Sequence, residues 1–236
     1  MIRTVAHIIS VANNKGGVGK TTTAINLAAG LAREQLEGVL VVDADASNAS
    51  ALCWRGVRQG GEAPFQVIGM QQPIIHKELP QLLKRSSYGF VIIDCPASGA
   101  AGAMTRSALM VSHLVVIPVQ PSGLDLWASD PMVQMIKEVR VYIPDLETRL
   151  LINRKAAQTR LAKQVRAGLD AFESEVFDAE IAQRTAIAEA ATRGQTIYEF
   201  DPGGLAVLDY NRLTHEVLAW AALRADALLA AAAARE

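Results

Sequence analysis

Residues 14–22 of the chain read Asn14-Lys15-Gly16-Gly17-Val18-Gly19-Lys20-Thr21-Thr22. This glycine-rich stretch follows a short apolar run rich in β-branched residues, His7 to Ala12, and overlaps the start of a segment of helical composition, Thr21 to Arg33. Strand, glycine-rich turn and helix in this order are the context that a phosphate-binding loop requires. Glycine permits backbone conformations that turn successive N–H groups inward, so the loop forms an anion nest at the positive end of the helix.

The residue types of the loop point to a nucleotide and a metal ion. A lysine in the position of Lys20 reaches the β- and γ-phosphates, and a hydroxyl in the position of Thr21 can coordinate Mg²⁺. The alternative is a chance glycine turn, which the register of glycines, lysine and threonine after a strand disfavours. We therefore predict that Mg-ATP binds through the loop residues Gly16, Gly17, Val18, Gly19, Lys20, Thr21 and Thr22.

The composition of the chain sets its broad class. Half of the 236 residues are hydrophobic, enough to bury the core of one α/β domain spanning residues 1–236. The formal net charge of −1 gives no overall basic field, so any contact with DNA would need a local patch. Cys53 and Cys95 lack the spacing of a disulfide framework or a zinc site. Without a signal-like N-terminus or a long apolar run, we expect a soluble, cytoplasmic protein.

Compact apolar runs predict the other strands. They lie at Val39–Val42, Phe90–Ile93, Leu114–Val119 and Leu150–Ile152, with a further short run at Phe65–Ile68. Helix-like segments separate several of them. Because these runs are continuous rather than alternating, they favour a mostly parallel, twisted sheet with helices on both faces.

The second half of the chain predicts mostly helix. From Thr159 onward, apolar residues recur at helical spacing, and a break at Asp201–Gly204 precedes a last helix. The residues expected to be buried are Leu161, Val165, Leu169 and Phe172 in the first part and Leu213, Val217 and Trp220 in the last helix. The alanine- and leucine-rich tail, 224–236, is expected to be a fraying helix end, with a partner-binding segment as the alternative.

A second lysine within the loop narrows the class of phosphate site. The plain pattern begins with glycine, but Asn14 holds that place here and Lys15 follows it. Lys20 already serves the site, so Lys15 either points to solvent or contacts phosphates that its own chain does not hold. The string KGGVGKTT resembles the deviant Walker A motif of the ParA/MinD family of P-loop ATPases. That resemblance implies that Lys15 reaches the nucleotide of a second subunit, so that ATP is sandwiched in a homodimer.

Carboxylates follow two of the predicted strands. Asp43 and Asp45 come after the run at 39–42, and two carboxylates at i and i+2 on an extended segment point the same way. The resemblance implies that Asp45 orients the attacking water and that Asp43 belongs to the switch region. Asp94 follows the run at 90–93 and resembles Walker B, where a carboxylate holds Mg²⁺ through water. Taken alone, each is also compatible with an acidic turn or an ordinary strand end.

Three further residues match the family pattern by their place in the chain. Asp125 follows the loop after the run at 114–119 and resembles a residue of the dimer face. Asn153 resembles an asparagine that reads the adenine amino group, and Pro202 a loop on the other adenine edge. After Asp45, however, Ala46 and Ser47 stand where the family usually has Pro-Gln, which leaves the detailed switch contacts in doubt.

The features absent from the sequence separate the branches of this family. Two scattered cysteines cannot hold an interfacial iron–sulfur cluster, and the tail lacks the basic amphipathic helix that would anchor a MinD-like protein to a membrane. The first strand starts close to Met1, so no helix-turn-helix region precedes it. The chain thus most resembles the short ParA partition ATPases, which implies a weak ATPase stimulated by a ParB-like adaptor and associated with the nucleoid.

Basic residues in the second half are candidates for contact with non-specific DNA. Five of them and no acidic residue occur between Ile152 and Leu169. An ordinary solvated helix face is the alternative interpretation. The candidate residues are Arg154, Lys155, Arg160, Lys163 and Arg166, with Arg184, Arg193 and Arg212 added from the placement of basic residues in the family.

The predicted function is an ATP-dependent switch that positions cargo. The cargo is a plasmid, a chromosome or a protein assembly such as a carboxysome or chemoreceptor cluster. Two alternatives remain open: a metabolic ligase of the same superfamily that uses the γ-phosphate to activate a small carboxylate, and a MinD-like membrane-associated ATPase. Stimulation of hydrolysis by DNA with an adaptor, or by a small molecule, would separate the first two.

Overall fold

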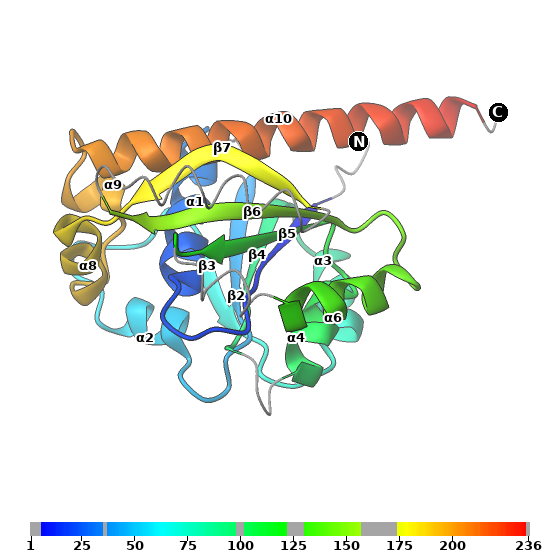
Figure 1. The fold of residues 1–236 in the computed structure, drawn as a ribbon, viewed down its shortest axis with the longest axis horizontal. Coiled ribbons are helices and arrows are strands. Elements are labelled where there is room, and N and C mark those ends of the chain that lie inside the picture. Colours follow the sequence, from blue (N-terminus) through cyan, green and yellow to red (C-terminus); the bar gives the residue numbers. More distant parts are fainter. Residues whose placement is uncertain (1–5, 35–36, 98–101, 122–129, 157–173, 235–236) are drawn as a thin grey trace.

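A computed structural model describes residues 6–34, 37–97, 102–121, 130–156 and 174–234. Within these residues, seven strands form one sheet with the order β3-β2-β4-β1-β5-β6-β7, and every pair of neighbours is parallel (Figure 1). The strands are β1 His7–Val11, β2 Gly38–Asp43, β3 Gln66–Gly69, β4 Tyr88–Asp94, β5 Leu114–Val119, β6 Glu147–Lys155 and β7 Glu175–Ala182.

Helices cover both faces of this sheet. They are α1 Lys20–Glu34, α2 Ser50–Gly56, α3 Ile75–Leu83, α4 Gly102–Leu109, α6 Asp130–Arg140, α8 Thr185–Thr192, α9 Ile197–Phe200 and α10 Leu205–Ala233. One core joins the sheet to α1, α2, α9 and α10, and a second core joins the other face to α3, α4 and α6. Successive strand residues alternate between the cores, with Val41 in the first and Leu40 and Val42 in the second. The predicted α/β fold is confirmed, and the sheet is entirely parallel.

The prediction of helix from Thr159 onward is wrong for one segment. Residues 157–173, which include the predicted apolar stripe, lie outside the described part of the chain, but Glu175–Ala182 is a strand. Its buried residues alternate, with Phe177, Ala179 and Ile181 facing the core shared with α10. The strand lies at the edge of the sheet, where polar residues on the other face are expected. A period of two at this edge was the signal that the helical interpretation missed.

The last helix closes the edge of the sheet. The Glu216 carboxylate of α10 accepts hydrogen bonds from the backbone N–H groups of Asp178 and Ala179 on β7, at 3.0 and 2.6 Å. These contacts use N–H groups that an edge strand would otherwise present to other chains. The predicted apolar stripe of α10 is also confirmed, because Leu213, Val217 and Trp220 are buried.

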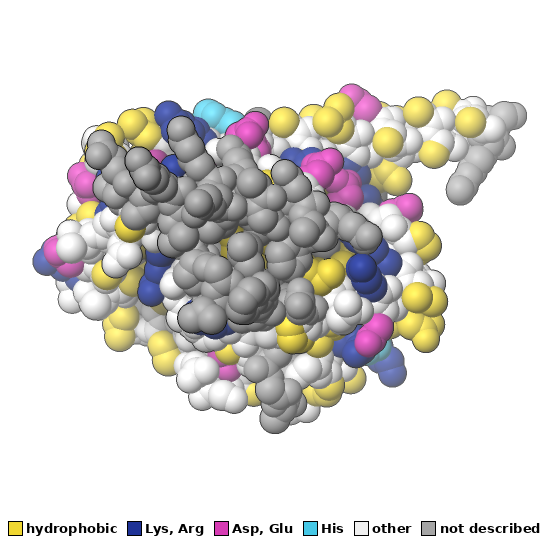
Figure 2. Space-filling view, in the orientation of Figure 1, with side chains coloured by type: hydrophobic (Ala, Val, Ile, Leu, Met, Phe, Trp, Pro, Cys, Tyr) yellow, Lys and Arg dark blue, Asp and Glu magenta, His cyan; other side chains and the backbone are white. Residues whose placement is uncertain are grey.

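The end of α10 extends beyond the body of the molecule (Figure 1). The helix continues to Ala233, but its last buried residue is Ala221. Hydrophobic side chains lie on the surface of the projecting part (Figure 2), where Leu223 and Leu229 are 70% and 66% exposed. The tail is therefore helical as far as Ala233 and gains little from packing against its own chain, while the predicted fraying remains a prediction.

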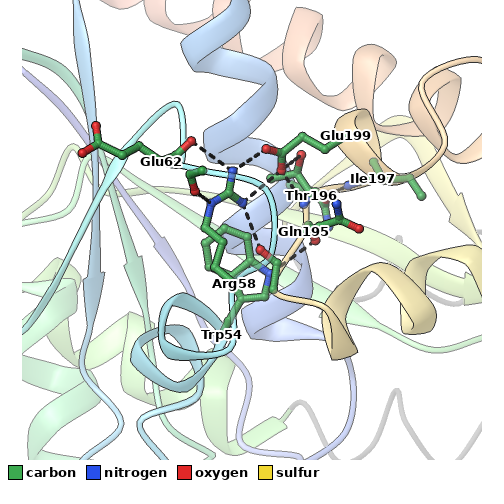
Figure 3. Close-up of polar contacts among 10 residues, drawn as sticks. Trp54, Arg58, Glu62, Gln195, Thr196, Ile197 and Glu199 are labelled. Carbon is green, nitrogen blue, oxygen red and sulfur yellow. Dashed lines mark hydrogen bonds and ion pairs between the residues drawn. The ribbon is translucent and has the colours of Figure 1, made fainter.

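A network centred on Arg58 fixes α2 and the loop after it to α9 (Figure 3). The Arg58 side chain is only 6% exposed and forms an ion pair with Glu199. Its guanidinium donates to the carbonyl oxygens of Gly61, Glu62 and Gly194 at 2.7, 3.0 and 2.9 Å. The arginine thus satisfies several loop carbonyls with one buried side chain, as its planar, multidonor head allows.

Further contacts extend this network to α1 and α2. Trp54 on α2 donates its indole N–H to the Gln195 carbonyl at 3.3 Å, and Thr196 forms a capping box with Glu199 at the start of α9 (Figure 3). On the other side, the Asn26 side chain on α1 accepts the N–H of Ile197 at 2.7 Å. The turn before α9 therefore joins two helices that begin near the predicted nucleotide site.

We expect Gly194→Ala to disrupt this junction. Gly194 has a φ of +61°, and a Cβ atom there would lie 2.4 Å from the Arg58 Cα and 2.6 Å from the Trp54 carbonyl oxygen. Because both obstacles are backbone atoms, the free energy of unfolding should fall by about 3 kcal/mol. Denaturant unfolding measures the effect. The control is Gly203→Ala, where nothing lies within 4 Å of the added Cβ; equal losses of stability in both variants would contradict this account.

Candidate nucleotide-binding site

The sheet brings the predicted site residues together at one edge. The register pairs Val11 at the end of β1 with Asp94 at the end of β4, and Asp94 with Asp43 at the end of β2. The phosphate loop follows β1 directly. Because parallel strands present their carboxyl ends at the same edge, the loop and both carboxylates share one crevice, which is where ligands bind in open α/β sheets.

The phosphate loop has the backbone that its glycines predict. Gly17 and Gly19 adopt positive φ angles of 75° and 92°. The Lys20 side chain is buried, and its ammonium donates to the Lys15 carbonyl at 3.0 Å, so the loop curls around this lysine. The side chain of Lys15, in contrast, is exposed. The two lysines therefore occupy different environments within one loop.

The asparagine before the loop braces it against the sheet. The Asn13 side chain donates to the Pro118 carbonyl of β5 at 2.8 Å and accepts the N–H of Lys15 at 2.9 Å. This residue was not predicted from the sequence. Its role depends on the adjacency of β1 and β5, which residue spacing alone does not reveal.

Asp94 is a buried carboxylate that fits a divalent cation. Among the described residues, neither of its carboxylate oxygens has a hydrogen-bond partner. Burial raises the pKa of Asp94 to about 7, against the opposing influence of the Thr21 hydroxyl and the Lys20 ammonium. The Thr21 hydroxyl thus lies close enough to lower this pKa without completing a hydrogen bond. An unpartnered carboxylate beside a hydroxyl provides the hard oxygen ligands that Mg²⁺ prefers.

Asp43 holds the loop that follows it. Its Oδ1 accepts the N–H of Asp45 at 3.0 Å, and its Oδ2 accepts the N–H of Leu52 in α2 at 2.9 Å. Burial raises the pKa of Asp43, while these backbone hydrogen bonds lower it. The structure therefore gives this residue a scaffold role within its own chain, in addition to the switch role that the family resemblance implies.

Asp45 is also engaged by its own loop. Its Oδ1 accepts the N–H groups of Ser47 and Asn48 at 2.9 and 3.0 Å, and its Oδ2 accepts the side-chain amide of Asn48 at 3.0 Å. Burial alone would raise the pKa of Asp45, but the hydrogen bonds from Asn48 and Ser47 outweigh it and hold the pKa below its ordinary value. The carboxylate is thus ionised at neutral pH. The sequence gave no reason to single out Asn48.

Asn153 lies against the phosphate loop. Its side-chain amide donates to the Val18 carbonyl at 2.7 Å, and its Oδ1 accepts the N–H of Arg154 at 2.9 Å. A Cβ atom on Gly19 would lie 2.3 Å from the Asn153 amide nitrogen, so a glycine is required at this close approach. Asn153 therefore supports the loop, and its predicted contact with adenine remains a prediction.

A cavity beside Asn153 has room for part of a nucleotide. Its volume is about 620 Å³, and its lining includes Gly19, Thr22, Asn153 and Arg184. This cavity continues outward from the phosphate loop between the ends of β6 and β7 and the helix α8. Pro202 is exposed on the turn before α10 and is not among the described residues that line the cavity. The structure thus gives no direct support to the predicted adenine contact of Pro202.

The candidate basic residues divide into three groups. Asp125 of the predicted dimer face and the basic residues Arg160, Lys163 and Arg166 lie outside the described residues. Arg154 and Arg212 are exposed. The others have partners: Lys155 pairs with Glu180, Arg184 lies 3.2 Å from Asp209, and the Arg193 guanidinium lies 4.9 Å from the Phe200 ring centre. The two ion pairs reduce the positive charge that these side chains offer to DNA.

The fold and the site define the class of this protein. A family model for the "CobQ/CobB/MinD/ParA nucleotide binding domain" (CbiA) matches residues 9–197. The chain belongs to this family of P-loop ATPases, and the predicted family is confirmed.

Several relatives that match almost the whole chain are named for chromosome partitioning or carboxysome distribution. The chain is 34% identical over 248 residues to the "Chromosome-partitioning ATPase Soj" of Thermus thermophilus, an alignment that covers 93% of this chain and 98% of that protein. It is 27% identical over 214 residues to the "Maintenance of carboxysome distribution protein A" of Halothiobacillus neapolitanus, covering 90% and 97%. The chain therefore lies among ParA/Soj-type relatives in this family.

Solved structures show the same fold. The cell division ATPase MinD of Pyrococcus furiosus matches with a TM-score of 0.73 at 21% identity, covering 92% of this chain and all of that one. MinD of Pyrococcus horikoshii, a complex with Mg-ADP, matches with a TM-score of 0.72 at 22% identity, covering 90% and 96%. Among the described helices of the present chain, none has the length and hydrophobicity that crossing a membrane requires.

We expect Asp94→Asn to stabilise the metal-free protein at about pH 7.5 while weakening binding of Mg-ATP. Burial raises the pKa of the folded carboxyl to about 7 from its ordinary value of 3.8, so stability is lost progressively as the pH rises from about 3.8 to about 7. Asparagine carries no such charge, and the gain should be about 1 kcal/mol. Thermal unfolding without magnesium, together with nucleotide titration in its presence, measures both effects.

Two comparisons make this prediction specific. The carboxyl of the unfolded chain ionises near pH 3.8, so the destabilisation develops between about pH 3.8 and 7, and at about pH 5.5 the stability difference should be about half of its value at pH 7.5. Asp226→Asn changes an exposed carboxylate on α10 and should leave stability and nucleotide binding unchanged. A gain in stability that is as large at pH 5.5 as at pH 7.5 would show that the charge of Asp94 is not its cause.

Proposed function

We propose that this protein is an ATP-driven switch that forms a homodimer around two Mg-ATP molecules. The main support for this proposal is the contrast between the two lysines of the phosphate loop, Lys15 and Lys20. Lys20 is buried and turned into its own loop, whereas Lys15 is exposed at the rim of the same loop. A lysine at this rim can reach phosphates held by a second subunit. Binding of ATP and dimerisation would then be thermodynamically linked.

Each remaining residue of the crevice has a role in this proposal. The backbone of residues 16–22 holds the phosphates, and Lys20 contacts the β- and γ-phosphates. Thr21 and Asp94 would hold Mg²⁺, which when bound would neutralise phosphate charge. Asp45 orients the attacking water, and Asn153 lies where it can contact the adenine. Hydrolysis by this arrangement is slow until a partner protein accelerates it.

The proposed task is positioning of cargo on DNA. The support is the similarity to Soj and to the carboxysome distribution protein, whose names refer to chromosome partitioning and carboxysome distribution. In the ATP-bound dimer, exposed basic residues such as Arg154 and Arg212 contact non-specific DNA, and a ParB-like adaptor that carries the cargo triggers release. The location of the protein then follows the nucleoid.

A metabolic ligase is the second candidate. Its support is the fold of cobyrinic acid a,c-diamide synthase from Mycobacterium smegmatis, which matches with a TM-score of 0.61 at 23% identity over 80% of this chain and 92% of that one. Hydrolysis stimulated by DNA and an adaptor supports the positioning switch. Hydrolysis stimulated by a small carboxylate, without DNA, supports the ligase.

We expect Lys15→Ala to abolish ATP-dependent dimerisation. The test uses an Asp45→Ala background, in which slow hydrolysis allows the ATP-bound dimer to accumulate. Light scattering should report a dimer with Mg-ATP for Asp45→Ala and a monomer when Lys15→Ala is added, while binding of nucleotide weakens by less than about tenfold. Lys77→Ala removes an exposed lysine on α3 and should leave the dimer intact. A dimer that persists without Lys15 would refute the proposed sandwich.

The proposed contact with DNA leads to a separate prediction. Binding to phosphates releases counterions, so replacing Arg154 by alanine should reduce the slope of log K against log salt by about one unit and weaken all DNA sequences alike. Arg212→Ala should act in the same way. Fluorescence anisotropy with duplexes of different sequence, at several salt concentrations, measures the slope. The control is Lys77→Ala, which removes an exposed lysine on α3 and should leave the slope unchanged. An unchanged slope for both Arg154→Ala and Arg212→Ala would contradict this contact.

A further inference from the structure

The carboxylate of Asp45 is held by two kinds of hydrogen bond. The N–H groups of Ser47 and Asn48 donate to Oδ1, and any non-proline residues at these positions would provide such donors. The contact with Oδ2 is different, because it comes from the side-chain amide of Asn48 at 3.0 Å. Of the three hydrogen bonds that the described residues donate to this carboxylate, this one alone depends on the identity of a side chain.

The loop that carries these donors is itself fixed at both ends. At the start of the loop, the Asp43 carboxylate accepts the N–H of Asp45. At the end of the loop, the same carboxylate accepts the N–H of Leu52, which lies in the first turn of α2. Between them, the N–H of Ala49 donates to the carbonyl of Asp45 at 2.8 Å. Ala49 adopts a left-handed conformation with a φ of 45°, which a residue other than glycine maintains only where its surroundings determine it.

With the backbone of the loop held in place, the Asp45 side chain can still rotate about its own torsion angles. Hydrogen bonds to Oδ1 alone fix one oxygen and allow the other to swing about it. The Asn48 amide fixes the second oxygen, and since a carboxylate oxygen has two lone pairs, Oδ2 can still accept a further hydrogen bond. A group that must orient a water molecule requires such immobilisation, because misplacement by about 1 Å costs rate.

We propose that Asn48 is a positioning residue for ATP hydrolysis, acting through the carboxylate of Asp45. This inference rests on the proposed function, in which Asp45 orients the attacking water. Asn48 also lines a cavity of about 360 Å³ together with Thr21 and Thr22 of the phosphate loop. The Asn48 amide thus connects the wall of that cavity to the Asp45 carboxylate. We expect loss of the Asn48 amide to leave nucleotide binding intact.

Two variants and one control test this role in the full-length protein with Mg-ATP. Asn48→Ala removes the amide, and Asn48→Asp keeps its shape but replaces the donor with an acceptor that faces Asp45. Both should lower kcat by about tenfold while KM for ATP stays within about twofold, because the lost interaction orients a reacting group rather than the nucleotide. Ser50→Ala, two residues further along, changes a residue that is not among the donors to Asp45 and should keep the native kcat.

The outcomes separate this inference from the function on which it rests. If Asp45→Ala abolishes hydrolysis but both Asn48 variants retain the native kcat, Asn48 has no positioning role. A rise in KM equal to the fall in kcat, or an equal fall in kcat for Ser50→Ala, would show general damage to the loop and overturn the inference. If Asp45→Ala itself hydrolyses ATP at the native rate, the proposed role of Asp45 fails first.

Discussion

The burial of Asp94 between two other strand ends is the constraint on which the site depends. The strand order places β4 between β1 and β2, so this carboxylate lies between the phosphate loop and the loop after Asp43. Neither of its oxygens has a hydrogen-bond partner among the described residues, and burial raises its pKa to about 7. A buried carboxylate without partners costs free energy that a cation can recover. The protein therefore maintains, at some expense of stability, the group that a magnesium ion would use.

Asp94 and Asp45 illustrate how one crevice gives two carboxylates different properties. Both lie close to Lys20, but the pKa of Asp94 is raised by burial without hydrogen bonds, whereas hydrogen bonds from Asn48 and Ser47 hold the pKa of Asp45 low. Environments that move two pKa values apart allow the groups to take different roles. A neighbouring cation would stabilise the charged form of Asp94 most. Asp45 is ionised and accepts hydrogen bonds even without a cation. Each property follows from the surroundings of the carboxylate, which are burial for Asp94 and hydrogen-bond donors of its own loop for Asp45.

The sequence predicted those parts of the structure that depend on local patterns. Continuous apolar runs gave the strands that contain Val41 and Ile92, and the glycines gave the phosphate loop. β7 was missed because its alternating pattern lies at an edge beside helical segments. The hydrogen bonds of Asn13, Asn48 and Arg58 were also missed. Asn13 and Arg58 depend on which segments meet after folding, and polar residues in loops carry no periodic signal.

The network around Arg58 suggests why distant segments are fixed to the site. Asn26 donates to the Thr22 carbonyl next to the phosphate loop and accepts the N–H of Ile197 before α9. From the same turn, Glu199 pairs with Arg58, and Gln195 accepts the indole N–H of Trp54 on the helix that follows the Asp45 loop. The phosphate loop and the Asp45 loop are thus both tied to one turn, which lies 171 residues after Asn26 and 141 residues after Trp54 in the chain. Because packed interiors transmit displacement rather than absorb it, a shift of either loop must be accommodated at that turn. The relative position of the phosphate loop and the Asp45 carboxylate is therefore set by the fold as a whole, not by the two motifs alone.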